Sequence, residues 1–271
     1  MTRVLGVDFS SAPTARKPIV VAIGDFESGT VAMREVVSLP TLHSFEEFLR
    51  GDSTFVGGFD FPFGLPREFL ESADDLPTTF LGVARWLRET PKEAIRDRFR
   101  AFMHDRPVGS KFAHRASDRL AGSSSSMKWV NPPVAWMCRE GVSRLVDAGL
   151  DLPGLHRGDP GRVALEAYPS VVARAITHAS YKSDERGKQT SARRDERIRI
   201  VAALEDGRPL GVAMTGPEAL RSRAIEDASG DTLDAMICAL QAAKASTEPG
   251  YGIPPDVDPL EGFIVGVPRA D

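Results

Sequence analysis

The sequence predicts a single α/β domain with a mixed central sheet, and two features of its 271 residues support this. The first is the order of patterns at the start of the chain, which runs strand, strand, strand, helix, strand. The second is an apolar, helix-like run near the end, GDTLDAMICALQAA. A composition of 42% hydrophobic and 27% charged residues suits a chain that builds a sizeable core.

Four short apolar runs mark the first strands, and the turn signals between them separate one from the next. We expect these strands at residues 3–7, 18–24, 30–39 and 54–60. The segment SFEEFLR lies before the fourth run, and Ser44 with Glu47 three residues later is typical of a capping box at a helix start. The expected order is therefore β-β-β-α-β.

From about residue 67 to residue 160 the pattern is helical, in FLGVARWLRET, PKEAIRDRFRAFM and VAWMCREGVSRLVDAG. We interpret this segment as an insertion that forms a lid or wall over the strand ends of one domain spanning residues 1–271. A buried strand is expected at residues 161–168, a helix in IRIVAALEDG, the carboxylate helix at about 230–245, and a last edge strand in GFIVGVP.

Acidic side chains occupy particular places in these elements. Asp8 and Asp60 end the first and fourth strands, and Glu166 lies in an otherwise apolar strand. Asp231 and Asp234 open the late helix three residues apart, which places both on one helix face. Each has a simpler explanation, because aspartate favours turns and acids favour the first turn of a helix. Together the five carboxylates predict a catalytic site in which all five residues act as metal ligands.

Carboxylate oxygens are the ligands that Mg²⁺ and Mn²⁺ prefer, so the expected cofactor is one of these ions. The formal net charge is −4, and two bound divalent ions would bring it to about zero. The charge therefore permits a nucleic-acid partner without favouring one.

A segment from Lys182 to Arg199 holds seven basic and four acidic residues. One interpretation is a solvated helix face with i,i+4 ion pairs. The other is contact with substrate phosphates through Lys182, Lys188, Arg193 or Arg197, with Ser10 contributing from the turn after Asp8.

Several classes of protein are disfavoured. Cys138 and Cys238 are far apart and form no C-x-x-C, which argues against a disulfide scaffold or a zinc knuckle and favours a cytoplasmic setting. The first apolar run is too short for a signal peptide, and no run approaches the roughly 20 residues of a membrane span, so no membrane partner is expected. The sequence has neither G-x-S-x-G nor G-x-G-x-x-G.

The motifs GVDFSSA, GFDFPFGLP, LEAYPS, GKQTSARRDERI, GDTLDAMICALQAA and EGFIVGVP resemble those of a family of uncharacterised proteins described as predicted ribonuclease H-like nucleases. The resemblance runs from residue 4 to about residue 268 and is loose over the helical insertion. The late D-x-x-D pair is similar to that of Holliday-junction resolvases, which usually carry glutamate where this chain has Asp60.

This resemblance implies a ribonuclease H-like fold and a nuclease that hydrolyses phosphodiester bonds of DNA or RNA with two divalent metal ions. Asp8, Asp60, Glu166 and Asp234 would be its catalytic residues. Actin-like ATPases and sugar kinases share the fold, so an ATP-dependent enzyme is an alternative, although the turn FSSAP lacks their phosphate-binding glycines. A non-catalytic nucleic-acid-binding scaffold is a third possibility.

Overall fold

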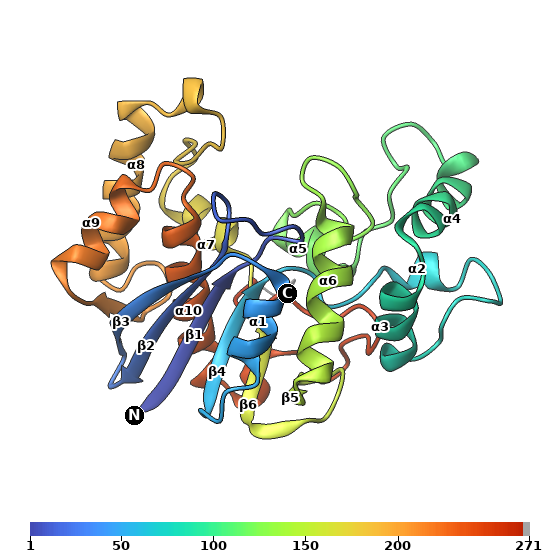
Figure 1. Ribbon diagram of the computed structural model, residues 1–271, viewed down its shortest axis with the longest axis horizontal. Helices are drawn as coiled ribbons and strands as arrows, with labels where there is room; N and C mark the ends of the chain where they lie inside the picture. The colour runs from blue at the N-terminus through green and yellow to red at the C-terminus, as the bar shows by residue number, and fades with distance from the viewer. Residues whose placement is uncertain (268–271) are drawn as a thin grey trace.

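The computed structural model describes residues 1–267, and these form a mixed α/β fold around a seven-stranded sheet of order β5-β6-β4-β1-β2-β3-β7 (Figure 1). The β1–β2 and β2–β3 pairs are antiparallel, whereas β1–β4, β4–β6, β5–β6 and β3–β7 are parallel. The strands are β1 (Thr2–Asp8), β2 (Ile19–Glu27), β3 (Thr30–Leu39), β4 (Phe55–Asp60), β5 (Leu150–Asp151), β6 (Asp159–Glu166) and β7 (Ala213–Thr215). The expected β-β-β-α-β beginning is confirmed.

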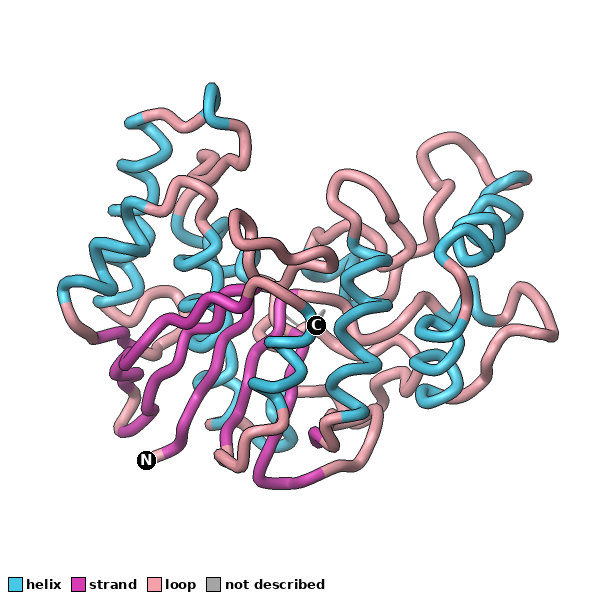
Figure 2. The backbone as a smooth tube through the Cα atoms, viewed as in Figure 1, coloured by secondary structure: helices cyan, strands magenta, loops and turns pink. Residues whose placement is uncertain are grey.

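Helices cover both faces of the sheet, because the strands are buried on both faces and alternate residues need a partner on each side (Figure 2). One face packs against α1 (Leu42–Leu49) and the insertion helices. The other face packs against α7 (Pro169–Ile176), α8 (Ser191–Glu205), α9 (Glu218–Glu226) and α10 (Asp231–Ser246). The central helix is α10, which is buried along almost its whole length.

The insertion between β4 and β5 is helical, as the sequence predicts. It contains α2 (Arg67–Leu70), α3 (Phe80–Glu89), α4 (Lys92–His104), α5 (Ala116–Ala121) and α6 (Val134–Asp147). Aromatic rings hold these helices to one another and to the sheet, with Phe69 packed against Phe99 at 5.0 Å between ring centroids. Two 3-10 turns, at Arg186–Lys188 and Pro249–Gly252, complete the described elements.

Two local expectations differ from the structure. Thr41, not Ser44, is the N-cap of α1, and Ser44 takes the third helical position, where its hydroxyl accepts the Thr41 N–H at 3.1 Å. The capping box is therefore present but begins three residues earlier. The expected edge strand in GFIVGVP is reduced to one parallel bridge between Ile264 and Glu166, and Pro268 lies outside the described residues. Within residues 1–267, no helix has the length and apolar character needed to cross a membrane.

Candidate active site

Asp8 and Asp60 lie side by side at the carboxyl ends of two parallel strands. Each is the last residue of its strand, and the register pairs Asp8 directly with Asp60. Adjacent strands are about 4.8 Å apart, so the two carboxylates share one edge of the sheet. The sequence places them at strand ends, and the parallel pairing of β1 with β4 brings the two ends together.

Two glycines let α10 approach this edge closely. Gly6 and Gly58 are themselves paired across β1 and β4, each two residues before its aspartate. A Cβ atom at Gly6 would lie 1.9 Å from the Ala235 carbonyl oxygen, and one at Gly58 would lie 2.3 Å from that of Cys238. Because residues two apart in a strand face the same side, the two aspartates project toward the face that α10 covers.

The first turn of α10 carries the other two aspartates. Asp231 is 7% exposed and Asp234 is fully buried. The N-cap of this helix is Gly230, and Asp227 accepts the Thr232 N–H at 2.8 Å. Asp231 is therefore not used to cap the helix, which removes the simplest structural explanation for that carboxylate.

Two lysines and a tyrosine balance part of this negative charge. Tyr181 donates its hydroxyl to Asp234 Oδ1 at 2.5 Å, and the Lys182 ammonium pairs with the other oxygen of Asp234. Lys17, in the loop after β1, pairs with Asp184 and lies 3.6 Å from Asp231. Four buried or half-buried aspartates thus face two ammonium groups, one of which is shared with a fifth carboxylate.

The excess of negative charge is reflected in the pKa values. Burial, followed by the charges of Asp234 and Asp231, raises the pKa of Asp8 well above its ordinary value, although Lys182 opposes the effect. Burial also raises the pKa of Asp60 to about 7, again against the influence of Lys182. The pKa of Asp231 is raised by burial and lowered in part by Lys17. These carboxyls would release their protons more readily if a further cation joined them.

Glu166 lies near these aspartates but belongs to a different network. It pairs in register with Phe59 rather than with Asp60, so its side chain leaves the opposite face of the sheet. There Arg115 donates to both of its carboxylate oxygens, at 2.7 and 2.5 Å, and the Phe63 N–H donates to Oε2 at 2.9 Å. Burial still raises the pKa of Glu166 despite Arg115. Arg115 of the insertion holds this carboxylate, so Glu166 does not join the four aspartates at the ends of β1 and β4 and at the start of α10.

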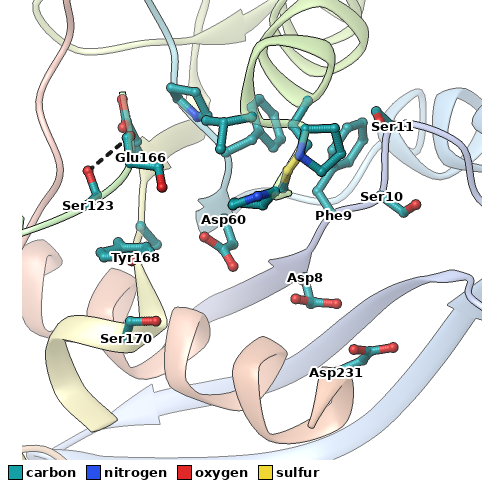
Figure 3. Close-up of a pocket in the computed structure, with 18 of the residues that line it drawn as sticks. Asp8, Phe9, Ser10, Ser11, Asp60, Ser123, Glu166, Tyr168, Ser170 and Asp231 are labelled. Carbon is teal, nitrogen blue, oxygen red and sulfur yellow. Dashed lines mark hydrogen bonds between the residues drawn. The ribbon is translucent and has the colours of Figure 1, made fainter. Parts of the chain in front are cut away.

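A cavity of about 530 Å³ opens at this edge of the sheet. In Figure 3 the carboxylates of Asp60, Asp8 and Asp231 follow one another along its floor, with Asp8 between the other two. Asp234 lies beneath this floor, fully buried, and contacts the cavity lining through Lys182. Glu166, Tyr168 and Ser170 line one side, and Phe9, Ser10 and Ser11 line another (Figure 3).

Three of the side chains expected to contact substrate phosphates differ in their exposure and in their partners. Ser10 lines the cavity and accepts the Ala12 N–H at 3.4 Å. Lys182 also lines it but is held by Asp234. Lys188 is exposed and pairs with Glu185 at 2.8 Å.

Arg197 requires a correction to the sequence-based expectation. It is only 3% exposed and donates to the carbonyl oxygens of Ile225 and Tyr181, at 2.6 and 2.7 Å. In this structure the guanidinium therefore joins α8 to its neighbours and is not available to a phosphate. Arg193, the remaining basic candidate, donates to the Lys182 carbonyl oxygen at 3.0 Å.

The donor set of the four aspartates suits a hard divalent cation, since it consists of carboxylate oxygens. As they stand, however, no three Asp, Glu, His or Cys side chains among residues 1–267 are spaced to hold a metal ion. Asp234 is not free to bind a metal ion, because the ammonium group of Lys182 already occupies one of its oxygens. A bound ion would require this lysine to move away.

Three residues that contribute to the charge balance carried no recognisable signal in the sequence. Arg115 and Tyr181 lie in irregular context, and Lys17 lies in a polar loop. Their partners are 51, 53 and 214 positions away for the pairs Arg115–Glu166, Tyr181–Asp234 and Lys17–Asp231. The glycine two residues before each strand-end aspartate is a signal that was present, since it marks where a helix approaches the strands.

Residues 6–258 match the model of a protein family described as "Protein of unknown function (DUF429)". Because this match covers most of the 271 residues, the chain belongs to that family. No curated protein and no solved structure matches the chain significantly.

Proposed function

We propose that this member of the DUF429 family is a divalent-metal-dependent nuclease with a ribonuclease H-like fold, hydrolysing phosphodiester bonds of DNA or RNA. The observation that carries the proposal is the convergence of four aspartates at one cavity. Asp8, Asp60 and Asp231 line its floor, Asp234 lies buried beneath it, and residues 1–267 supply too few cations to balance them. The β-β-β-α-β order of the first elements also supports it, as the sequence resemblance implies this beginning.

The residues that would hold the metal ions are Asp8, Asp60, Asp231 and Asp234. Asp8 lies between Asp60 and Asp231, so it would be the central ligand of such a site (Figure 3). Bound Mg²⁺ or Mn²⁺ would supply an activated water and stabilise the charge that develops on the phosphoryl oxygens. Glu166, held by Arg115, would shape the neighbouring wall of the cavity.

The protein's own groups would prepare this site in the metal-free state. Tyr181 orients the buried Asp234 through one carboxylate oxygen, and Lys182 balances the charge of the other oxygen until a metal ion displaces it. Lys17 performs a similar role for Asp231 from the more exposed side. The raised pKa values of Asp8 and Asp60 mean that a cation and a proton compete for these carboxylates, so metal binding should strengthen as pH rises.

Thermal unfolding of the chelator-treated protein tests the metal site. Mg²⁺ or Mn²⁺ should raise the melting temperature, because a ligand at 100 times its Kd stabilises the native state by about 2.7 kcal/mol. Asp8→Asn should abolish this response, whereas Asp52→Asn, at an exposed loop position, should retain it. A metal response of full size in Asp8→Asn would count against the site.

Cleavage assays test the reaction. Labelled single-stranded and branched DNA and RNA should be cut only when Mg²⁺ or Mn²⁺ is present, and Asp8→Asn should be inactive. Tight ATP binding without cleavage would favour the ATP-dependent alternative. Nucleic-acid binding that ignores both metal and Asp8→Asn would favour a non-catalytic scaffold.

A further inference from the structure

The cavity has an acidic floor and an apolar wall, and the wall has no role in the function proposed above. Besides the aspartates, the lining contains a group of apolar residues from the turn after β1, the segment after β4 and the start of α6. These apolar residues are Phe9, Phe61, Pro62, Pro132, Pro133, Val134 and Met137.

The insertion builds most of this wall. Val134 is the first residue of α6, and Met137 is three positions later, so both lie on the same helix face. Both are half-buried, and the two prolines before them are exposed. On the sheet side, the Phe9 ring packs against Phe61 with centroids 4.7 Å apart. Phe9 and Phe61 are themselves buried, so they support the wall from behind, and its open surface is formed by Pro132, Pro133, Val134 and Met137.

Within the part of the chain that the structure describes, the basic side chains that line the cavity are all engaged by carboxylates. Lys17 pairs with Asp184, Lys182 with Asp234, and Arg115 with Glu166 and Asp118. Binding along a nucleic-acid backbone depends on many cationic contacts with successive phosphates. The lining offers instead an anionic floor, to which a phosphate can bind through a metal ion, and an apolar wall.

The size of the cavity agrees with a small ligand. Its volume of about 530 Å³ lies within the range of roughly 300–1,000 Å³ that is usual for small-molecule sites. A nucleotide combines the two chemistries that the cavity presents, since it carries a phosphate at one end and a flat, largely apolar base at the other.

We infer that the cavity accepts one nucleotide unit at a time, with its phosphate at the acidic floor and its base against the open part of the wall, formed by Pro133, Val134 and Met137. The inference rests on the proposed function and narrows it to short oligonucleotides and the free ends of single strands. In the reaction, water forms a new P–O bond, the P–O bond to the neighbouring nucleoside breaks, and the departing oxygen takes up a proton. The products are a phosphate monoester and an alcohol.

Calorimetric titration in the presence of Mg²⁺ distinguishes binding at the acidic floor from binding at the apolar wall. The probes are 5′-AMP, which has both a phosphate and a base, and ribose 5-phosphate, which lacks the base. Stacking of one base contributes about 1–3 kcal/mol, so 5′-AMP should bind on the order of tenfold more tightly or better. Equal affinities for the two probes, or no detectable binding of 5′-AMP, would overturn the inference.

Variants of Met137 locate the base. Met137→Gln keeps the length of the side chain but makes it polar, and it should reduce the advantage of 5′-AMP over ribose 5-phosphate severalfold. Met137→Leu keeps an apolar surface and should preserve that advantage. An unchanged ratio in a folded Met137→Gln protein would contradict the placement of the base.

A comparison of linear and closed circular single-stranded DNA tests the preference for ends. The linear form should be degraded and the circular form should resist, whereas equal cleavage of both would refute the preference. The metal-dependent shift in melting temperature is measured on the same samples. If the metal-dependent shift is present but neither the base of the ligand nor the free ends of the DNA change binding or cleavage, the substrate inference fails and the metal site stands. If the shift is absent, the proposed function itself fails.

Discussion

Two groups of carboxylates line the same cavity, and they differ in how their charge is balanced. At the end of β6, Glu166 and Asp118 share the buried guanidinium of Arg115, which donates to Asp118 Oδ1 at 2.7 Å and to both oxygens of Glu166. At the ends of β1 and β4, Asp8 and Asp60 form no ion pair with any other residue in the described range 1–267, and burial raises the pKa of both.

The difference shows that a carboxylate at a strand end has two possible roles in one fold. An arginine within the chain satisfies Glu166 and ties the insertion to the sheet. The aspartates around Asp8 are left with a deficit of positive charge, which is the arrangement expected of groups that await an external cation. Four experiments test this contrast.

Removing Arg115 should have the largest effect. The variant Arg115→Met leaves Glu166 and Asp118 buried without their cation, and loss of one partner from a buried pair costs about 3–5 kcal/mol of stability. Urea unfolding measures the loss. The double variant Arg115→Met/Glu166→Gln should recover part of it, because one buried charge is then absent. A loss below about 1 kcal/mol would show that Arg115 is not the structural tie described here.

Replacing Asp60 should stabilise the protein, in contrast to the loss of Arg115, and the gain in stability should depend on pH. The folded pKa of about 7 exceeds the unfolded value of about 3.9. Between these values the unfolded chain loses its proton first, so wild-type stability declines as pH rises. Asp60→Asn lacks this decline, and its stability relative to wild type should grow by at most about 4 kcal/mol from pH 4 to pH 8, since one pKa unit corresponds to about 1.4 kcal/mol.

Unfolding of metal-free protein across this pH range tests the expectation, with Asp52→Asn at an exposed position as the control for a general charge effect. Parallel stability profiles for wild type and Asp60→Asn would show that Asp60 is not held in a charge-deficient site. Saturating Mg²⁺ should remove most of the difference in slope, because it supplies the missing cation.

Lys182 tests whether the internal cation and the metal ion compete. Lys182→Met removes the ammonium group from Asp234, so the affinity for Mn²⁺ should rise on the order of tenfold, which equals about 1.4 kcal/mol. Calorimetric titration of metal into metal-free protein gives the Kd. Lys244→Met, which removes an ammonium of α10 that pairs with Glu248, should leave the Kd unchanged. A weaker affinity in Lys182→Met would mean that the lysine supports the metal site.

Lys188 should give the smallest effect. It forms an exposed pair with Glu185, and such pairs contribute roughly 0–1 kcal/mol. Lys188→Ala should therefore change urea stability by less than about 0.5 kcal/mol. Arg197→Ala, at a buried position bonded to two backbone carbonyls, should be clearly destabilising. Equal effects would contradict the distinction between exposed and buried cations in this segment.

Much of the fold was predictable because its signals are local. Strands β1 to β4 follow apolar runs bounded by turns, and the three long insertion helices follow their apolar periodicity. The short strand β7 and the helix α9 were not recognised, since three residues carry too little pattern and α9 is mostly polar. The start of α1 was displaced because Thr41 and Ser44 are both good capping residues, and local sequence does not decide between them.

The site was predictable in part for the same reason. Asp8, Asp60, Asp231 and Asp234 stand at ends of elements, and the sequence alone places them there. It also places Glu166 within a late strand, but the side of the sheet that this residue faces depends on strand register. A shift of one residue in pairing reverses every side chain, and the pairing of Glu166 with Phe59 turned it toward Arg115.

Local sequence signals therefore establish the types of most elements, the positions of the acidic residues within them and the glycines that allow α10 to approach. The packing of distant segments decides which carboxylates share a cation and which do not. That decision depends on charges brought together from segments far apart in the chain, such as Lys182 with Asp234 and Arg115 with Glu166. Electrostatic energy depends on distance and burial in space, and neither can be known before the sheet, the insertion and α10 are packed together.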